Sequence, residues 1–368
     1  MLWINSPLSI IDINKFPTTR YQGSKRKLLP WLHKNIAPLK FESTLDVFGG
    51  TATVSYLFKK MGKQVHFNDY LKCNYFTGKA LIENNNIVLT DDDINFLISK
   101  HKTIAYSKFV QKTFEGIYYT TEENKWIDIF LGNWLNLAKM YPRRTASIKQ
   151  ALAFTAFSQS ALKKRPFNLF HRANLNIRTR RVKRTFGNKT SWEGSFETYF
   201  ANFARELNDA VFDNSKANDA SSKMASELKN NKPDLIYIDP PYIRQGVSRT
   251  EVDYMRFYHF LEGAADPLHW EQRIDFKSKN LHLIQKKTND WIDPSKNRSA
   301  FENLFSLYKD STIVISYKEP GIPSKRELIN SLKKFKTKVI SIPGIKYDYA
   351  LNKNNGYHKE YLLIGVEE

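Results

Sequence analysis

Short apolar runs alternate with amphipathic stretches near the start of the chain. Residues 44–48 have the pattern of a buried strand, residues 53–61 have the spacing of a helix, and residues 65–69 form a second apolar run. A strand, a helix and a second strand in this order are typical of the first unit of a parallel sheet. A helix is also predicted at 24–39, where Ser24 can cap the first turn.

The same pattern returns in the C-terminal part of the chain. Strands are predicted at 235–238 and 312–316, and a helix is predicted at 324–335. The apolar runs 339–342 and 361–364 predict a closing antiparallel hairpin with a long turn. These elements indicate an α/β fold with a mostly parallel sheet.

The middle of the chain follows a different pattern. Helices are predicted at 91–101, 123–140 and 145–162, and no strong strand run lies among them. We therefore expect a helical insertion at 72–208. The sheet domain is then formed by the two flanking segments, residues 1–71 and 209–368.

The charge balance is strongly basic. The chain has 57 Lys and Arg against 37 Asp and Glu, a net charge of +20, and a pI of about 9.6. Such a surplus favours a polyanionic partner, either nucleic acid or an anionic membrane surface. The chain also has 25 Phe, 19 Tyr and 7 Trp, which offer faces for stacking bases and so favour nucleic acid. A basic surface that serves solubility alone is the alternative.

Several classes of protein are disfavoured by the sequence. The single cysteine, Cys73, excludes an intrachain disulfide and a zinc site built on cysteines. The N-terminus lacks the pattern of a signal peptide, and no run of about 18 apolar residues occurs. We expect a soluble, cytoplasmic and monomeric protein with no membrane partner and no metal ion.

Basic residues are concentrated near the end of the predicted insertion. Of the 27 residues from Lys163 to Lys189, 10 are Lys or Arg and none is acidic. Such a stretch can neutralise several phosphates, although a solvated basic face that contacts nothing is the alternative. The candidate DNA-binding residues are Lys163, Lys164, Arg165, Arg172, Arg178, Arg180, Arg181, Lys183 and Arg184.

The tetrapeptide Asp239-Pro240-Pro241-Tyr242 directly follows the predicted strand 235–238. The carboxyl ends of strands are where open α/β sheets bind ligands. The prolines fix φ and lack an N–H, so the Asp239 carboxylate and the Pro240 carbonyl form a rigid pair of acceptors that matches the two donors of an NH₂ group. Tyr242 adds a ring that can stack on a base. A proline turn that merely ends the strand is the alternative.

A second motif, Asp46-Val-Phe48-Gly49-Gly, follows the first strand. A glycine turn lets the backbone approach a ligand closely. Asp69 ends the next strand, 23 positions after Asp46, where an acidic residue binds ribose hydroxyls in nucleoside-binding sheets. The pattern G-x-G-x-x-G of dinucleotide sites is absent, and so is a P-loop.

These motifs together resemble the Dam-type (class D12) family of DNA adenine-N6 methyltransferases, especially its members from restriction-modification systems. The resemblance covers most of the chain and rests on four stretches, which are Arg20-Tyr-Gln-Gly-Ser-Lys-Arg-Lys-Leu-Leu, Asp46-Val-Phe-Gly-Gly, Arg165-Pro-Phe-Asn-Leu-Phe-His-Arg-Ala-Asn-Leu and Tyr237-Ile-Asp-Pro-Pro-Tyr. It implies a Rossmann-like methyltransferase fold, S-adenosyl-L-methionine as cofactor and double-stranded DNA as substrate. It leaves a cognate restriction endonuclease as a candidate partner.

The resemblance also implies roles for individual residues. Lys25 would contact the cofactor carboxylate, Asp46 its amino group and Asp69 its ribose. Asp239 would lie between the cofactor and an adenine that is flipped out of the duplex, with Pro240 and Tyr242 as its catalytic partners. The cofactor-binding residues would be Tyr21, Lys25, Asp46, Phe48, Gly49, Asp69, Asp219 and Asp239.

Asp219 is the weakest of these matches. The family usually has an acidic residue after the third strand, and Asn218-Asp219 is the best match for it. The strand that would precede it, Val211-Phe212, is short.

Three alternatives remain at this stage. Cytosine-N4 methyltransferases generally resemble this pattern with Ser at the position of Asp239, and RNA methyltransferases often have Asn there. A DNA-binding subunit that has lost catalysis belongs to a different class. The intact tetrapeptide, together with Lys25, Asp46 and Asp69, argues against that loss.

Overall fold

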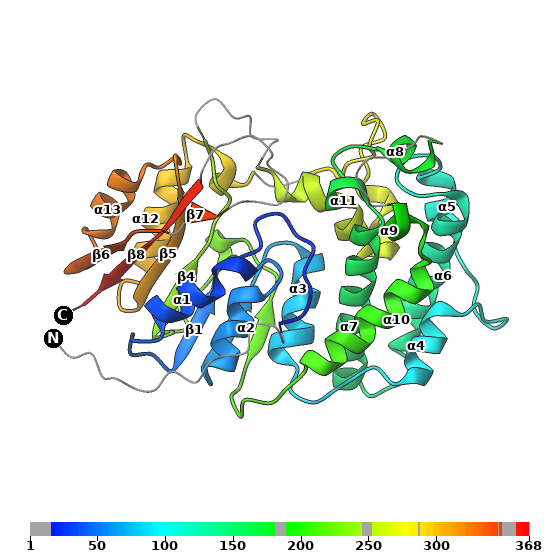
Figure 1. Cartoon of the computed structure of the whole chain (residues 1–368), viewed down its shortest axis with the longest axis horizontal. Helices are drawn as coiled ribbons and strands as arrows, with labels where there is room; N and C mark the ends of the chain where they lie inside the picture. The colour runs from blue at the N-terminus through cyan, green and yellow to red at the C-terminus, as the bar shows by residue number, and fades with distance from the viewer. Residues whose placement is uncertain are drawn as a thin grey trace.

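The computed structural model describes residues 16–180, 189–244, 252–285, 288–344, 346–347 and 358–367. A sheet covered by helices forms one side of the molecule, and a group of packed helices forms the other (Figure 1). None of the helices in these ranges is both long and apolar enough to cross a membrane.

The strands form one mixed sheet in the order β3-β2-β1-β4-β5-β8-β6, with β7 paired to β8. β3, β2, β1, β4 and β5 are parallel, whereas β8 runs antiparallel to both β5 and β6. This is the Rossmann-like methyltransferase arrangement that was predicted. The strands are β1 (Ser43–Asp46), β2 (Gln64–Asn68), β3 (Asp219–Ser221), β4 (Leu235–Ile238), β5 (Thr312–Glu319), β6 (Lys338–Ile342), β7 (Lys346–Tyr347) and β8 (His358–Val366).

Helices cover both faces of the sheet. Leu57 of α2 (Thr53–Lys60) and Leu32 of α1 (Leu29–Ile36) are buried in the same core as Tyr237 of β4. On the opposite face, α12 (Asn297–Leu307) and α13 (Lys325–Leu332) pack against a second core that includes Ile236 of the same strand. Alternate residues of β4 therefore point into different cores, as the period of a strand requires.

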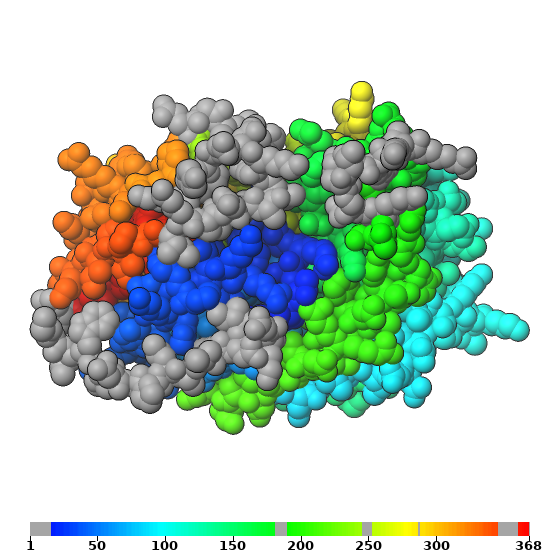
Figure 2. Space-filling model, viewed as in Figure 1, coloured from blue at the N-terminus to red at the C-terminus, as the bar shows by residue number. Residues whose placement is uncertain are grey.

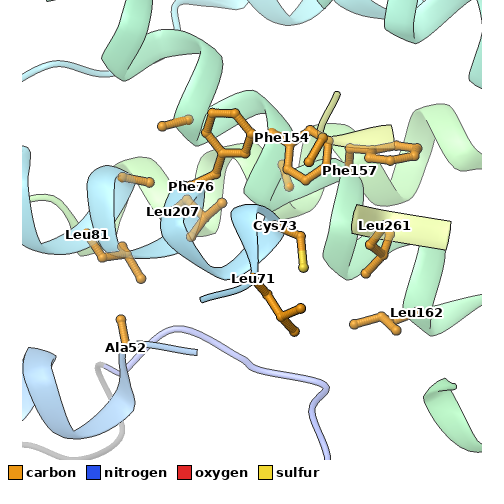
Figure 3. Close-up of a cluster of buried hydrophobic side chains, with 14 of the residues drawn as sticks. Ala52, Leu71, Cys73, Phe76, Leu81, Phe154, Phe157, Leu162, Leu207 and Leu261 are labelled. Carbon is orange, nitrogen blue, oxygen red and sulfur yellow. The ribbon is translucent and has the colours of Figure 1, made fainter. Parts of the chain in front are cut away.

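The helical side of the molecule shares a core with the sheet. Phe154, Phe157 and Leu207 pack in the same cluster as Ala52 and Leu71, which belong to the sheet side (Figure 3). The helices are α3 (Lys72–Gly78), which continues into a π-helical turn (Lys79–Glu83), α4 (Asp91–Ile98), α5 (Phe109–Thr113), α6 (Thr121–Leu137), α7 (Arg143–Lys163), α8 (Leu175–Thr179), α9 (Lys189–Glu193), α10 (Phe196–Ala210) and α11 (Tyr254–Ala264). Short 3₁₀ turns occur at Arg26–Leu28, Pro166–Asn168, Ala225–Glu227, Pro267–His269, Glu271–Arg273 and Asp290–Ile292.

A segment after β4 also belongs to the helical side. Trp270 lies 5.3 Å from Phe109, 5.1 Å from Phe114 and 5.0 Å from Phe260 of α11, measured between ring centroids. The helical part is therefore formed by more than the predicted insertion, because a piece of the predicted sheet domain near α11 packs with it. The pattern of apolar residues in the segment around α11 did not indicate whether it would pack with the sheet or with the helices.

The N-terminal segment runs between the two sides. Thr18 donates its backbone N–H to the Glu206 carboxylate (2.5 Å), and Arg20 donates its own to the Gln159 side chain (2.9 Å). On the face drawn in Figure 2 the blue N-terminal residues lie directly against the green helices. The residues that follow this segment, Tyr21 to Lys25, are thereby held at the boundary between sheet and helices.

The third strand differs from the prediction. Val211 and Phe212 are not in a strand; Val211 caps α10 instead. β3 begins at Asp219 and pairs with β2, so Asp219 lies within the strand and not after it.

Candidate active site

A cavity opens at the carboxyl ends of β1, β2 and β4. Parallel pairing places Asp46 at the end of β1 beside Tyr237 of β4, and so close to Asp239. The cavity is open to solvent, and the space between its atoms, open solvent included, is about 670 Å³. Its walls include nine of the residues that were predicted to bind the cofactor or to act in catalysis, which are Tyr21, Lys25, Asp46, Phe48, Gly49, Asp69, Asp239, Pro240 and Tyr242.

The glycine turn after β1 is constrained by its neighbours. A Cβ at Gly49 would lie 2.1 Å from the ring of Phe67, and Gly50 has a φ of +53°. Asp69 fixes the same turn, because one of its carboxylate oxygens accepts the Gly50 N–H at 2.9 Å. The sequence therefore folds here into a tight loop whose backbone faces the cavity.

Asp46 has one satisfied and one unsatisfied carboxylate oxygen. The Ser55 hydroxyl donates to Oδ2 at 2.6 Å, whereas Oδ1 is buried and has no hydrogen-bond partner within the described ranges. Burial raises the pKa of Asp46 to about 7, although the Ser55 hydrogen bond acts in the opposite direction and Asp239 and Asp69 add to the rise. A buried acceptor without a partner at the wall of a cavity is suited to a ligand donor.

Asp69 is held by the backbone on both sides. Its second oxygen accepts the N–H of Leu71 at 2.8 Å. Burial raises its pKa to about 6, and the hydrogen bonds from Leu71 and Gly50 oppose the rise. Its carboxylate is thus fixed at the end of β2, where it can accept a further donor.

Aromatic rings line another wall of the cavity. Tyr21 stacks on Tyr258 at 4.3 Å and on Tyr254 at 5.5 Å between centroids, and its hydroxyl accepts a hydrogen bond from Asn74 (2.9 Å). Tyr254 and Tyr258 belong to α11, a helix that was not predicted, so their contact with Tyr21 could not be expected from the sequence. Their stack fixes the ring of Tyr21 beside the glycine turn.

The tetrapeptide carboxylate is anchored through one oxygen. Oδ1 of Asp239 lies 2.9 Å from Nζ of Lys25 and also accepts the hydroxyl hydrogen of Tyr242. No hydrogen bond is made to Oδ2 by any residue that the structure describes. Burial raises the pKa of Asp239, and the nearby Lys25 ammonium opposes this.

A buried glutamate that sequence reasoning missed completes this group. Nζ of Lys25 lies 2.7 Å from Oε1 of Glu360 on β8 and 2.7 Å from the Tyr242 hydroxyl. Glu360 is 0% exposed. A charged residue directly before the apolar run 361–364 was the available signal, since a fully buried carboxylate requires a partner.

The geometry bears on two predicted roles. Three acceptors (Asp239, Glu360 and Tyr242) surround the Lys25 ammonium, and Lys25 also lines the cavity, so its contact to a cofactor carboxylate stays a prediction. Asp219 is outside the cavity, 63% exposed, and its carboxylate lies 2.9 Å from His66. It is not retained as a cofactor-binding residue.

Part of the basic stretch is structural. Lys164 lies 2.8 Å and Arg178 2.5 Å from the Glu123 carboxylate, and both side chains are almost fully buried. Arg165 is 2% exposed and donates to the backbone carbonyls of Tyr118, Leu169 and Arg172. These three were predicted to contact DNA, but they hold the helices together instead.

The remaining basic residues divide into two groups. Arg172 and Arg180 are exposed, and Lys163 is half-buried with its ammonium 3.9 Å from the ring centroid of Tyr199. Three further predicted contacts, Arg181, Lys183 and Arg184, lie outside the described residues.

Comparison with known proteins finds relatives that match most of this chain. The type II methyltransferase M2.HphI of Haemophilus parahaemolyticus is 28% identical over 95% of this chain and 98% of its own length. The modification methylase StsI of Streptococcus sanguinis is 28% identical over 93% of this chain and 50% of its own length. The type II methyltransferase M.FokI of Planomicrobium okeanokoites is 23% identical over 85% of this chain and 46% of its own length.

The family model of the D12 class N6 adenine-specific DNA methyltransferases matches residues 21–289. The matched range begins at Tyr21, beside the cavity, and contains the glycine turn, the helical part and the tetrapeptide. This chain belongs to the D12 class of N6 adenine-specific DNA methyltransferases.

Proposed function

We propose that this protein transfers the methyl group of S-adenosyl-L-methionine to the N6 amino group of adenine at a specific sequence in double-stranded DNA. We further propose that it is the modification enzyme of a restriction-modification system. The names of its relatives, type II methyltransferases and modification methylases, support the second part. The observation that supports the first part most strongly is the Asp239 carboxylate, which is anchored through Oδ1 and leaves Oδ2 available at the cavity.

The residues of the cavity fit this cofactor. Oδ1 of Asp46 is a buried acceptor without a partner in the described part of the chain, and an amino group is the complementary donor. The fixed carboxylate of Asp69 suits ribose hydroxyls, and the backbone of the Gly49 turn allows close approach. When bound, S-adenosyl-L-methionine supplies a methyl group already activated by a sulfonium.

The tetrapeptide then acts on the target base. Adenine cannot be reached inside a duplex, so the protein receives it flipped out of the stack. Oδ2 of Asp239 and the carbonyl of Pro240 accept the two N–H groups of the amino group, which turns the nitrogen lone pair toward direct in-line attack. The half-buried ring of Tyr242 stacks on the base while its hydroxyl holds Asp239.

Double-stranded DNA reaches the site across the basic helical side. Arg172 and Arg180 remain as candidate phosphate contacts, and Lys163 remains with them. An endonuclease that cleaves the same DNA sequence is the partner that a modification enzyme implies.

The experiment is a transfer assay. The protein is mixed with S-adenosyl-L-methionine labelled in its methyl group and with DNA, RNA or neither, and the labelled nucleoside is identified. We expect label only in DNA and only as N6-methyladenine. Label in N4-methylcytosine or in RNA would replace the proposal with one of its enzyme rivals. DNA binding without any transfer would favour the subunit that has lost catalysis.

A further inference from the structure

Two carboxylates share one ammonium at the wall of the cavity. Lys25 is 3% and Glu360 0% exposed, and Nζ lies 2.7 Å from Glu360 and 2.9 Å from Asp239. Glu360 itself is not among the residues that line the cavity. We propose that Glu360 is a positioning residue for methyl transfer, which acts through Lys25 to keep the Asp239 carboxylate oriented.

Glu360 is held rigidly by its own surroundings. It lies on β8, between β5 and β6, and it accepts the hydroxyl hydrogen of Ser316 from β5. The Tyr242 hydroxyl lies 3.3 Å from the same oxygen, Oε1. Oε1 of Glu360 and Oδ1 of Asp239 thus both contact the Lys25 ammonium and both lie near the Tyr242 hydroxyl, so the position of one depends on the other.

The charge balance of the group gives Glu360 its effect. Asp239, Glu360 and Lys25 together carry a net charge of −1 when all three are ionised. The buried Lys318 faces the same group, but burial lowers its pKa to about 7, so it adds less than a full positive charge above that pH. Without Glu360 the charge of Lys25 would be compensated by Asp239 alone, and the group would be neutral. Positive charge develops on the amino nitrogen as it attacks, so a net negative group stabilises that step and a neutral one does so less. This part of the inference rests on the proposed function.

Other titratable groups surround Asp239. Asp46 faces it from β1, Tyr237 from β4 and Tyr242 from its own loop. Lys318 of β5 faces Glu360 and Lys25, with Arg244 beside it. Among all of these, Lys25 lowers the pKa of Asp239 and Glu360 raises it, so their removal shifts that pKa in opposite directions.

The test is the pH profile of kcat at saturating cofactor and DNA, which reports groups in the complex. In Glu360→Gln we expect kcat to fall by about tenfold or more at its plateau and the acidic limb to move to lower pH by about one unit. In Lys25→Gln the limb moves to higher pH. In the double variant it returns toward the wild-type position, because both opposing charges are gone. The KM for the cofactor stays unchanged in Glu360→Gln, since Glu360 does not line the cavity.

A second readout does not depend on turnover. Fluorescence of 2-aminopurine at the target position of the DNA reports entry of the base into the site without cofactor. We expect weaker fluorescence enhancement in Glu360→Gln than in the wild type, and restoration in the double variant. Should Glu360→Gln fail to fold, two other variants still test the proposal. The acidic limb of the pH profile should lie at higher pH in Lys25→Gln and near the wild-type position in the double variant.

Asp93→Asn is the matched control. Asp93 forms a buried ion pair with Lys149 on the helical side, far from this group in the fold, with side chains 1% and 7% exposed. We expect it to lower thermal stability without moving the limb. The inference would be overturned if the acidic limb of the kcat profile stayed in place in Glu360→Gln. It would also be overturned if the limb moved in the same direction in both single variants. A wild-type protein that transfers no methyl group to adenine would instead overturn the proposed function.

Discussion

The hydroxyl of Ser55 donates a hydrogen bond of 2.6 Å to Oδ2 of Asp46, and Oδ1 of the same carboxylate is buried without a partner in the part of the chain that the structure describes. Ser55 therefore orients the carboxylate and leaves one acceptor for a ligand. Since Ser55 lies on α2 and Asp46 ends β1, the contact also ties the two elements that flank the glycine turn.

Replacement of Asp46 should weaken cofactor binding. A hydrogen bond to a charged group contributes about 1.5–3 kcal/mol, so Asp46→Asn should raise the Kd for S-adenosyl-L-methionine by roughly 10- to 150-fold. Isothermal titration measures this directly. Asp219→Asn is the control, because Asp219 lies outside the cavity and its change should leave the Kd as it was.

Cofactor binding should also depend on pH. Burial raises the pKa of Asp46 to about 7, so its carboxylate becomes protonated as the pH falls through that value. An amino cation binds the ionised form, and affinity should therefore be full above pH 7 and decline below it. Titration of the wild type from pH 8.5 to 5.5 should show this decline, and Asp46→Asn should remove most of it. A flat profile in the wild type would show that Asp46 does not bind the amino group.

Glu123 should matter for folding of the helical side. Lys164 and Arg178 both pair with it in a buried position, so Glu123→Ala leaves two buried cations and should cost about 3–5 kcal/mol of unfolding free energy. Hydrogen bonds from these two cations lower the pKa of Glu123 although burial raises it. A lowered folded-state pKa contributes stability above the ordinary value near 4.5 that is lost as the pH falls below it. Denaturant unfolding of both proteins at pH 7 and pH 4 should show the difference shrinking in acid.

Two arginines of the basic stretch should behave differently. Arg172 is exposed, and Arg172→Ala should reduce the slope of log Kd for DNA against log salt by about 0.9, the loss expected for one phosphate contact. Arg165 is buried among backbone carbonyls, and Arg165→Met should lower Tm while the slope stays the same. A reduced salt dependence of DNA binding in Arg165→Met, together with an unchanged Tm, would contradict the structural role of Arg165.

Much of the sheet was predictable because its strands are apolar runs that end in polar motifs. The strand 235–238 was predicted with the bounds it has, and its position explains why Asp239 lies at the edge of the sheet. β3 was missed because Asp219–Ser221 has no apolar residue other than Ala220, and its pairing with β2 was invisible in the local pattern.

The site was less predictable wherever it depended on distant segments. Glu360 and Lys25 are 335 positions apart, and Tyr258 reaches Tyr21 from a helix that periodicity had not indicated. Similarly, counting basic residues could not separate Arg165, which is buried in a network, from Arg172, which is exposed. Burial is decided by tertiary packing, so charge patterns alone overestimated the DNA-binding surface.

The central claim is that Asp239 holds the amino group of an adenine while it is methylated. The direct measurement is to express the wild type and Asp239→Ala in a host without DNA methylation and to sequence each genome for modified bases. We predict N6-methyladenine at one recurring sequence with the wild type and none with Asp239→Ala, with both proteins folded by circular dichroism. Equal methylation by the two proteins, or a modified base other than adenine, would contradict the claim.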